Sequence, residues 1–171
     1  MIYKTHMTPA KTIKNLQKGF TLIELLVVIG ILAILLAIVL IAINPAKQFG
    51  QANDTKRSSD VNAILNAVNQ YMADHKGVVP PNMPAAGAAA LVIKSGAVGN
   101  AGDLCAALVT TFIADLPIDP TAGTRSYNSG DCTQAGATYN TGYQISVSAA
   151  DNRITVSTTT TYSGVPITVT R

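Results

Sequence analysis

Glu24 is the only charged residue between Lys18 and Lys47, and it lies near the start of a long aliphatic segment. A carboxylate in apolar surroundings is costly unless a cation or hydrogen-bond donors partner it. The position of Glu24 therefore has two interpretations. It is either a charge-pairing site within an apolar assembly, or an interfacial side chain at the end of a plain membrane anchor.

Cys105 and Cys132 are the two cysteines of the chain. If this part of the chain is exported to an oxidising compartment, an even pair predicts a disulfide, and two buried free thiols are the alternative. Closing a loop of that length contributes about 3.5 kcal/mol in the chain-entropy treatment. A metal site is disfavoured because the sequence near the two cysteines contains no histidine.

Residues that could form an active site are sparse. His6 lies in the basic N-terminal segment, and His75 stands near the end of a predicted helix. The sequence lacks the motifs of serine hydrolases, zinc proteases and P-loop proteins. Asp115, Asp119, Asp131 and Asp151 are scattered along the chain. We therefore expect no enzyme, no catalytic residue, no cofactor and no assigned metal ligand.

The element that must position Glu24 is the aliphatic segment that follows it. Of the 19 residues from Leu25 to Ile43, 15 are Leu, Ile or Val. They contribute about −4.5 to −9 kcal/mol to membrane insertion, whereas an acidic residue costs at most about 3 kcal/mol. The segment is therefore expected to span a membrane as a helix despite Glu24.

The orientation of this span follows from the residues before it. Residues 1–19 carry Lys4, Lys11, Lys14 and Lys18 and no acidic residue. By the positive-inside rule this end stays in the cytoplasm, and the chain beyond about residue 46 is exported. Removing these four lysines from the 12 basic residues leaves eight against nine acidic ones. The net charge of +3 therefore reflects membrane topology and does not indicate a nucleic-acid-binding surface.

An ordinary signal peptide has a shorter apolar stretch and then a small-residue cleavage site, but here "INPAKQFG" follows the long apolar run. A signal anchor, or a signal cut on the cytoplasmic side, fits better. The segment "KGFTLIELLVVIGILAIL" resembles the class III signal of type IV prepilins and type II secretion pseudopilins. The shared pattern is a basic leader, a glycine, an aromatic residue, Thr-Leu-x-Glu and about 20 apolar residues.

This resemblance implies how the segment is processed and used. A prepilin peptidase would cleave between Gly19 and Phe20 and methylate the new amine of Phe20. In a filament, Glu24 would neutralise the Phe20 amine of a neighbouring copy. The spacing is compatible with both roles, because Glu24 lies one helical turn beyond Phe20 and a carboxylate in the first turn complements the helix dipole.

A second helix is predicted after an interruption at Asn44-Pro45. Its apolar residues recur at helical spacing, and Gly77 ends it. They are Val61, Ile64, Leu65, Val68 and Met72. The nearby charged residues Asp54, Lys56, Arg57 and Asp60 are interpreted as a solvated face.

The remainder is predicted to be an exported loop-and-sheet region. Residues 77–102 are rich in Gly, Ala and Pro, with a possible short helix in the alanine run. A second short helix, capped by Asp103, should end before Pro117. The segment "TGYQISVSAADNRITVSTTTTYSGVPITVT" alternates apolar and polar residues around a turn, which predicts a hairpin and a last strand. The stretch from "LPIDP" to "YQISV" resembles the major pseudopilin, a likeness that raises a calcium site without naming ligands.

We therefore predict an α+β, pilin-like fold, with a long N-terminal helix packed on a small antiparallel sheet. Its parts are a removed leader (1–19), an assembly helix (20–46), an amphipathic helix (47–76) and a globular region (77–171). The predicted function is a structural filament subunit with prepilin peptidase, other pilins and the assembly machinery as partners. A minor or competence pilin that binds surfaces or DNA is the alternative, and a membrane-anchored enzyme is a weaker one. The sequence leaves open which machine the subunit serves, and whether the Asn53-Asp54-Thr55 sequon is glycosylated.

Overall fold

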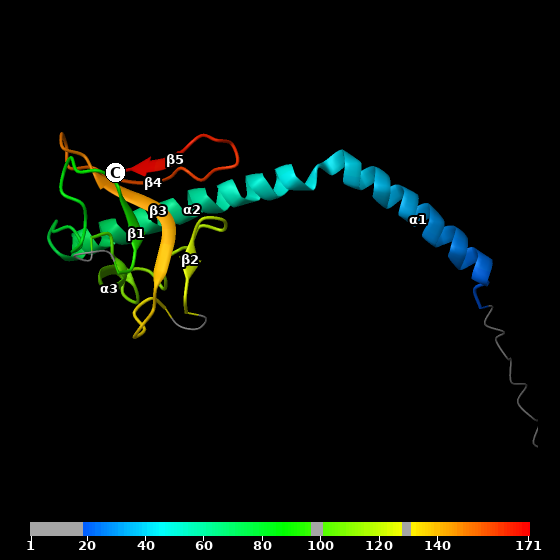
Figure 1. Ribbon diagram of the computed structural model, residues 1–171, viewed down its shortest axis with the longest axis horizontal. Coiled ribbons are helices and arrows are strands. Elements are labelled where there is room, and N and C mark those ends of the chain that lie inside the picture. Colours follow the sequence, from blue (N-terminus) through cyan, green and yellow to red (C-terminus); the bar gives the residue numbers. More distant parts are fainter. Residues whose placement is uncertain (1–18, 97–100, 128–130) are drawn as a thin grey trace, which may run out of the picture. The chain divides into compact units, whose positions relative to one another are not determined.

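The computed structural model describes residues 19–96, 101–127 and 131–171 (Figure 1). The chain divides into two compact units, Met1–Asn44 and Pro45–Arg171. In its described part the first unit is a single helix, and the second unit holds the other helices and the sheet. The leader predicted at residues 1–19 lies outside the described residues, apart from Gly19.

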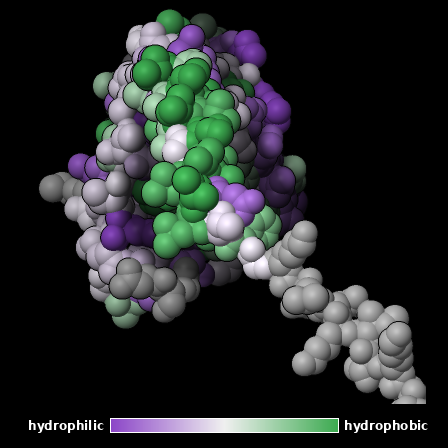
Figure 2. Space-filling model, turned by 90° about the vertical axis from the view of Figure 1, so that its right-hand side faces the viewer, coloured by the Kyte–Doolittle hydropathy of each residue, from purple (hydrophilic) through white to green (hydrophobic). Residues whose placement is uncertain are grey.

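Helix α1 (Leu22–Ile43) forms the first unit. Its 22 residues extend about 33 Å at 1.5 Å per residue, enough to cross a bilayer core of about 30 Å. None of its residues is buried, and Figure 2 shows a continuous hydrophobic surface. An apolar surface of this extent needs lipid or other protein chains to cover it.

The predicted interruption between the helices is present. Asn44 adopts a left-handed backbone conformation, with φ 44° and ψ 80°, and ends α1. Helix α2 (Pro45–Asp74) begins at the next residue. Proline suits the first position of a helix, because its missing N–H has no partner there in any case.

The amphipathic pattern of α2 gives the predicted buried stripe. Val61, Ile64, Leu65 and Val68 are fully buried, and Met72 packs half-buried against the core. Beyond the helix, Gly77 has a positive φ of 88° and donates its N–H to the Met72 carbonyl at 2.7 Å. Glycine adopts this backbone conformation without strain, which explains why the helix ends here.

The sheet is antiparallel throughout and packs one face on α2. Its strands are β1 (Leu91–Lys94), β2 (Thr124–Arg125), β3 (Tyr139–Val147), β4 (Ile154–Thr158) and β5 (Ile167–Thr170). Their order is β1-β3-β4-β5, and β2 also pairs with β3. Buried and part-buried residues alternate along all of β3. The predicted fold class, with its hairpin and last strand, is confirmed.

The inward side chains of the sheet complete one core with α2. Ile145 pairs with Val156 across β3 and β4, and Val156 pairs with Val169 on β5. Ile145 and Val156 are fully buried. The register therefore places apolar residues from three strands against the α2 stripe, and it leaves mostly threonine, serine and glutamine on the outer face.

Two local predictions are wrong: the helix in the alanine run, and the N-cap of the short helix after Asp103. The alanine run does not form a helix, because Gly87 has a positive φ of 77° and donates its N–H to the Val147 carbonyl at 2.9 Å. The chain then enters β1 instead. The predicted short helix itself is present as α3 (Cys105–Leu108) and ends before Pro117, since Val109 is already extended. Asp103 is not its N-cap residue, although its carboxylate accepts the Cys105 N–H at 3.2 Å.

Cys105 and Cys132 are joined by a disulfide, with their Cα atoms 6.0 Å apart. Both residues are buried. The bond connects the start of α3 to the segment before β3, 27 residues further along the chain. It therefore closes a loop that the secondary structure holds only weakly, because α3 has four residues and β2 has two.

We expect every copy of the protein isolated from cells to carry this disulfide. Alkylation under denaturing conditions should add no label before reduction and two labels after it. Because buried free thiols would react once the chain is unfolded, only a disulfide explains the absence of label. Intact-mass measurement distinguishes the two results. Two labels on the unreduced, denatured chain would contradict the bond.

Candidate assembly site at the start of the apolar helix

The first turn of α1 is held by a capping box between Thr21 and Glu24. The Thr21 side chain accepts the Glu24 N–H at 3.3 Å. In return the Glu24 carboxylate accepts the Thr21 N–H and the Thr21 hydroxyl, each at 2.8 Å. The Thr-x-x-Glu spacing thus satisfies donors that an N-terminal helix turn leaves free. This local role of Glu24 is an addition to the one expected from the sequence.

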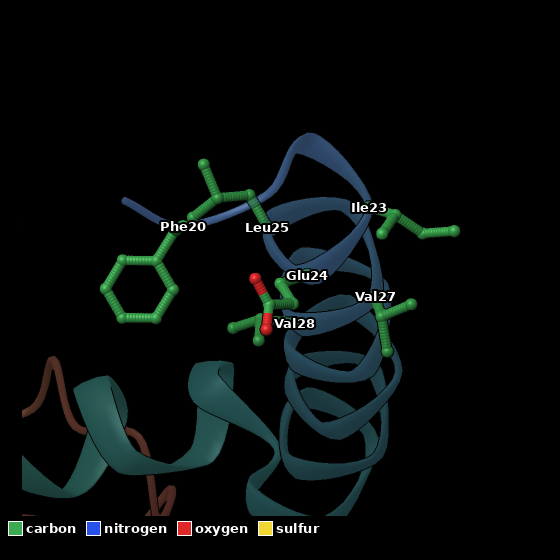
Figure 3. A pocket seen from close by; sticks show the side chains of 6 residues that line it. All are labelled: Phe20, Ile23, Glu24, Leu25, Val27 and Val28. Carbon is green, nitrogen blue, oxygen red and sulfur yellow. The ribbon is translucent and has the colours of Figure 1, made fainter. Parts of the chain in front are cut away.

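The surroundings of Glu24 are apolar and open. Figure 3 shows the Glu24 carboxylate directed to the side of the helix on which the Phe20 ring lies, with Val28 one turn further along. Phe20 is 84% exposed. Gly19 is exposed as well, and a Cβ added to it would meet no atom of the described residues within 4 Å. The peptide bond between Gly19 and Phe20 is therefore open to approach by another protein.

This arrangement presents one negative charge on an otherwise apolar helix surface. The donors that the structure gives Glu24 are neutral groups of Thr21, so neither of them cancels the charge of an ionised carboxylate. The helix dipole already favours a negative charge at this end. Chemically, the site is suited to pair with a cation brought by another chain, within apolar surroundings that would strengthen the attraction.

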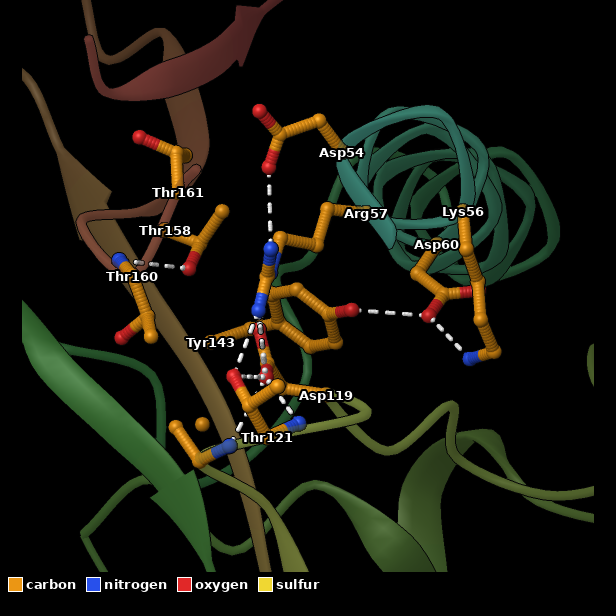
Figure 4. A network of polar contacts seen from close by, with 12 residues as sticks. Asp54, Lys56, Arg57, Asp60, Asp119, Thr121, Tyr143, Thr158, Thr160 and Thr161 are labelled. Atoms are coloured by element: carbon orange, nitrogen blue, oxygen red, sulfur yellow. Dashed lines mark hydrogen bonds and ion pairs between the residues drawn. The ribbon is translucent and has the colours of Figure 1, made fainter. Parts of the chain in front are cut away.

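The globular unit contains a second polar site, which the sequence did not reveal. Arg57 of α2 is 3% exposed, and its Nε donates to Asp119 at 2.7 Å (Figure 4). Its other nitrogens donate to Asp119 at 3.2 Å, to Asp54 at 2.9 Å and to Thr121 at 2.6 Å. The prediction of a solvated face is therefore wrong for Arg57, which ties α2 to the loop before β2.

Asp119 is the buried partner in this network, with 1% exposure. Burial raises the pKa of its carboxyl, but hydrogen bonds from Arg57 and from the Thr121 and Ala122 N–H groups outweigh burial and lower the pKa to about 2. Asp119 therefore stays charged in the folded protein, and its negative charge is balanced by the Arg57 guanidinium.

Asp60 also belongs to the sheet side of α2. Its carboxylate accepts the Tyr143 hydroxyl at 2.7 Å and the Lys56 ammonium at 2.7 Å (Figure 4). Burial and the Asp60 carboxylate raise the pKa of Tyr143, so its hydroxyl remains a donor. Since the Tyr143 side chain is fully buried, this bond satisfies a polar group inside the core.

The other scattered aspartates serve as local acceptors. Asp115 accepts the Tyr127 hydroxyl at 2.9 Å, and Asp131 accepts the Thr133 N–H at 2.8 Å. Among residues 19–96, 101–127 and 131–171, no three His, Cys, Asp or Glu side chains are grouped to hold a metal ion. The structure thus gives the aspartates local roles in turns and tyrosine hydrogen bonds.

The structure thus has an apolar, capped helix with one carboxylate in its first turn, joined to a small α+β unit. This is the architecture expected of a subunit that carries a prepilin-type N-terminal signal. A family model described as the prokaryotic N-terminal methylation motif matches residues 14–40. The chain is 35% identical over 147 residues to fimbrial protein EcpC of Eikenella corrodens, which covers 74% of this chain and 90% of that protein. It is 44% identical over 77 residues to the type IV major pilin protein PilE1 of Neisseria gonorrhoeae. This second match covers 42% of the chain and 32% of that pilin. No solved structure matches significantly.

The chain belongs to the type IV pilin family. It is a structural pilus subunit, and membership of the family implies assembly into filaments with other pilins. The exposed apolar surface of α1 fits both membrane anchoring and packing in such a filament. The family assignment thus agrees with the resemblance noted in residues 18 to about 43.

Proposed function

We propose that this pilin is inserted in the cytoplasmic membrane through α1, with its N-terminus inside and its globular unit exported. The four lysines before Phe20 support this orientation by the positive-inside rule. The disulfide between Cys105 and Cys132 supports export, because such bonds persist in oxidising compartments. After assembly the globular unit would lie on an extracellular or periplasmic filament.

The proposed processing step is cleavage between Gly19 and Phe20 by prepilin peptidase, followed by methylation of the Phe20 amine. This would remove residues 1–19 as a leader. The open surroundings of Gly19 and the match of the methylation motif to residues 14–40 support the proposal. Cleavage would also create a cationic amine on Phe20, four residues before Glu24 and directly ahead of the Thr21 N-cap.

The mature subunit then polymerises through α1. The observation that carries this proposal is an apolar helix without a buried residue, with Glu24 as its one acidic residue, placed in the first turn. In the filament, Glu24 would pair with the Phe20 amine of a neighbouring copy and fix the axial register of the two helices. The names of the two relatives favour a pilus over a secretion pseudopilus. We therefore infer that pilus assembly machinery is the partner.

We expect filaments sheared from cells to contain this chain with an N-methylated Phe20 as its first residue. Mass spectrometry of the intact subunit and of its N-terminal peptide measures this directly. Replacing Gly19 with a bulkier residue such as valine should block cleavage, because the peptidase requires close approach to the backbone. Filaments that contain the chain with Met1 intact, or cut after residue 43, would refute the processing step.

A further inference from the structure

Five large hydrophobic side chains are exposed in the described part of the unit Pro45–Arg171. They are Phe49, Val78, Val79, Tyr162 and Val165, with exposures from 42% to 71%. They gather at the two ends of α2. Phe49, Tyr162 and Val165, here called the proximal patch, lie where α2 begins. Val78 and Val79, the distal patch, follow its last turn.

The side chains of the proximal patch are held in place by contacts with α2. The ring of Tyr162 lies against the backbone of Gly50, where an added Cβ would overlap its ring atoms. Asp54 of α2 accepts the Tyr162 N–H at 3.0 Å and the Ser163 N–H at 3.2 Å. The loop between β4 and β5 is therefore fastened beside the first half of α2, and its exposed side chains are held in place (Figure 1).

This fastening extends into the buried network. Asp54 also accepts Arg57 at 2.9 Å, and Arg57 binds the buried Asp119. The hydrogen bond from the Tyr162 N–H, with further ones from the Ser163 N–H and Arg57, lowers the pKa of Asp54, so its carboxylate stays charged and can accept all three.

The two patches differ in composition and lie far apart on one unit. From Phe49 to the end of α2 the helix rises about 40 Å at 1.5 Å per residue. A filament repeats one subunit by a screw operation, so its contacts join different surfaces of successive copies. Two unlike apolar patches at opposite ends of a rigid helix have the geometry of such a head-to-tail contact.

We propose that the proximal patch of one subunit packs against the distal patch of another copy of this chain within the filament. The inference rests on the proposed polymerisation through α1. Five side chains are too few for an interface of about 1,200 Å², the lower limit for stable association. The contact therefore forms only where α1 packing already holds the globular units at high effective concentration.

Cysteine cross-linking in intact filaments tests this contact. The variant V79C/V165C, treated with a short bis-maleimide, should give a ladder of dimers, trimers and larger species on denaturing gels. The native cysteines do not react, because they are joined to each other. The matched control V79C/S59C carries its second cysteine at an exposed site midway along α2 and should remain mostly monomeric.

Two further variants make the test specific. V165C alone should stay monomeric, since the proximal patch meets a different patch. G50A raises helix propensity, but its Cβ displaces the Tyr162 ring. When G50A is added to V79C/V165C, the amount of cross-linked species should therefore fall at least threefold.

Intact filaments in which V79C/V165C stays monomeric, the result expected if the proximal patch faced lipid, would overturn the contact. Dimers from V165C alone would overturn it too, because the patch would then meet itself. Failure of the parent chain to form filaments at all would instead refute the proposed function.

Discussion

Glu24→Ala should leave cleaved subunits in the membrane and produce few or no filaments. The aliphatic residues of α1 dominate insertion, so the variant should enter the bilayer at least as well as the parent. In the filament, however, it would leave the Phe20 amine of a neighbour unpaired in apolar surroundings. Removing one partner of a buried ion pair costs roughly 3–5 kcal/mol, which corresponds to two to four orders of magnitude in each association step.

The capping box makes a sharper variant available. Glu24→Ala removes both the charge and the acceptor of the Thr21 N–H and hydroxyl. Glu24→Gln keeps an acceptor at the same position, since glutamine also completes a capping box, but it has no charge. If the charge is what assembly requires, Glu24→Gln should assemble nearly as poorly as Glu24→Ala.

Thr21→Val provides the complementary control. It removes the hydroxyl that caps α1 and leaves the Glu24 charge in place. Loss of an N-cap costs about 1 kcal/mol, so filaments should still form, with at most a small loss in yield. Yield is measured by shearing filaments from cells with equal amounts of membrane-bound subunit. Normal filament yield from Glu24→Gln would show that capping, and not charge pairing, is the role of this residue.

The helices and the β3–β4 hairpin could be predicted because their signals are local. The stripe from Val61 to Val68 repeats every three or four residues, and β3 alternates along its length. The aliphatic residues of α1 and the spacing of Gly19, Phe20 and Glu24 are likewise contained in one short segment. Such patterns indicate which face of an element is buried even when the element that packs against it is unknown.

The partnership of Arg57 and Asp119 could not be predicted, because 62 residues separate them. Charged residues at the start of an amphipathic helix usually face solvent, and nothing near Asp119 in the sequence distinguishes it from the other aspartates. One signal was available. Arg57 lies four residues before Val61 and so extends the buried stripe by one turn. A charge on that stripe predicts a buried counter-charge, though not its position.

The strands β1 and β2 were missed for a related reason. They have four and two residues, and both form only by pairing with β3. Segments this short carry little intrinsic preference, and the alanines before β1 favour a helix in isolation. The hydrogen bond from Gly87 to Val147 shows that tertiary contact decided the conformation.

Arg57→Ala should destabilise the globular unit by roughly 3–5 kcal/mol, because it leaves Asp119 charged and buried without its cationic partner. Such a loss is a large share of the 5–15 kcal/mol typical of a domain. Asp119→Ala should also be destabilising: Arg57 keeps Asp54 as a partner at 2.9 Å, but the Thr121 and Ala122 N–H groups, each 2.8 Å from the Asp119 carboxylate, lose their acceptor. Urea unfolding of the full chain in detergent, followed by near-ultraviolet circular dichroism of its tyrosines, measures the change.

Lys56→Ala is the matched control on the same helix. Its ammonium lies 2.7 Å from Asp60, the same separation as between Arg57 Nε and Asp119, but the Lys56 side chain is 50% exposed. Water screens such a pair, so its loss should cost at most about 1 kcal/mol. Equal destabilisation by Lys56→Ala and Arg57→Ala would show that distance, and not burial, sets the strength of these pairs.

The pH dependence of unfolding separates the charge of Asp119 from its packing. The folded pKa of Asp119 is about 2, below its ordinary value of 3.8, so the unfolded chain binds its proton more readily. The resulting stabilisation is complete above pH 3.8 and is lost as the pH falls through 2, a change of about 2 kcal/mol. Asp119→Asn has no such titration. The stability difference between the parent and Asp119→Asn should therefore be constant above about pH 5 and shrink between pH 4 and 2. A difference that stays the same down to pH 2 would mean that Arg57 holds Asp119 through shape and hydrogen bonding alone.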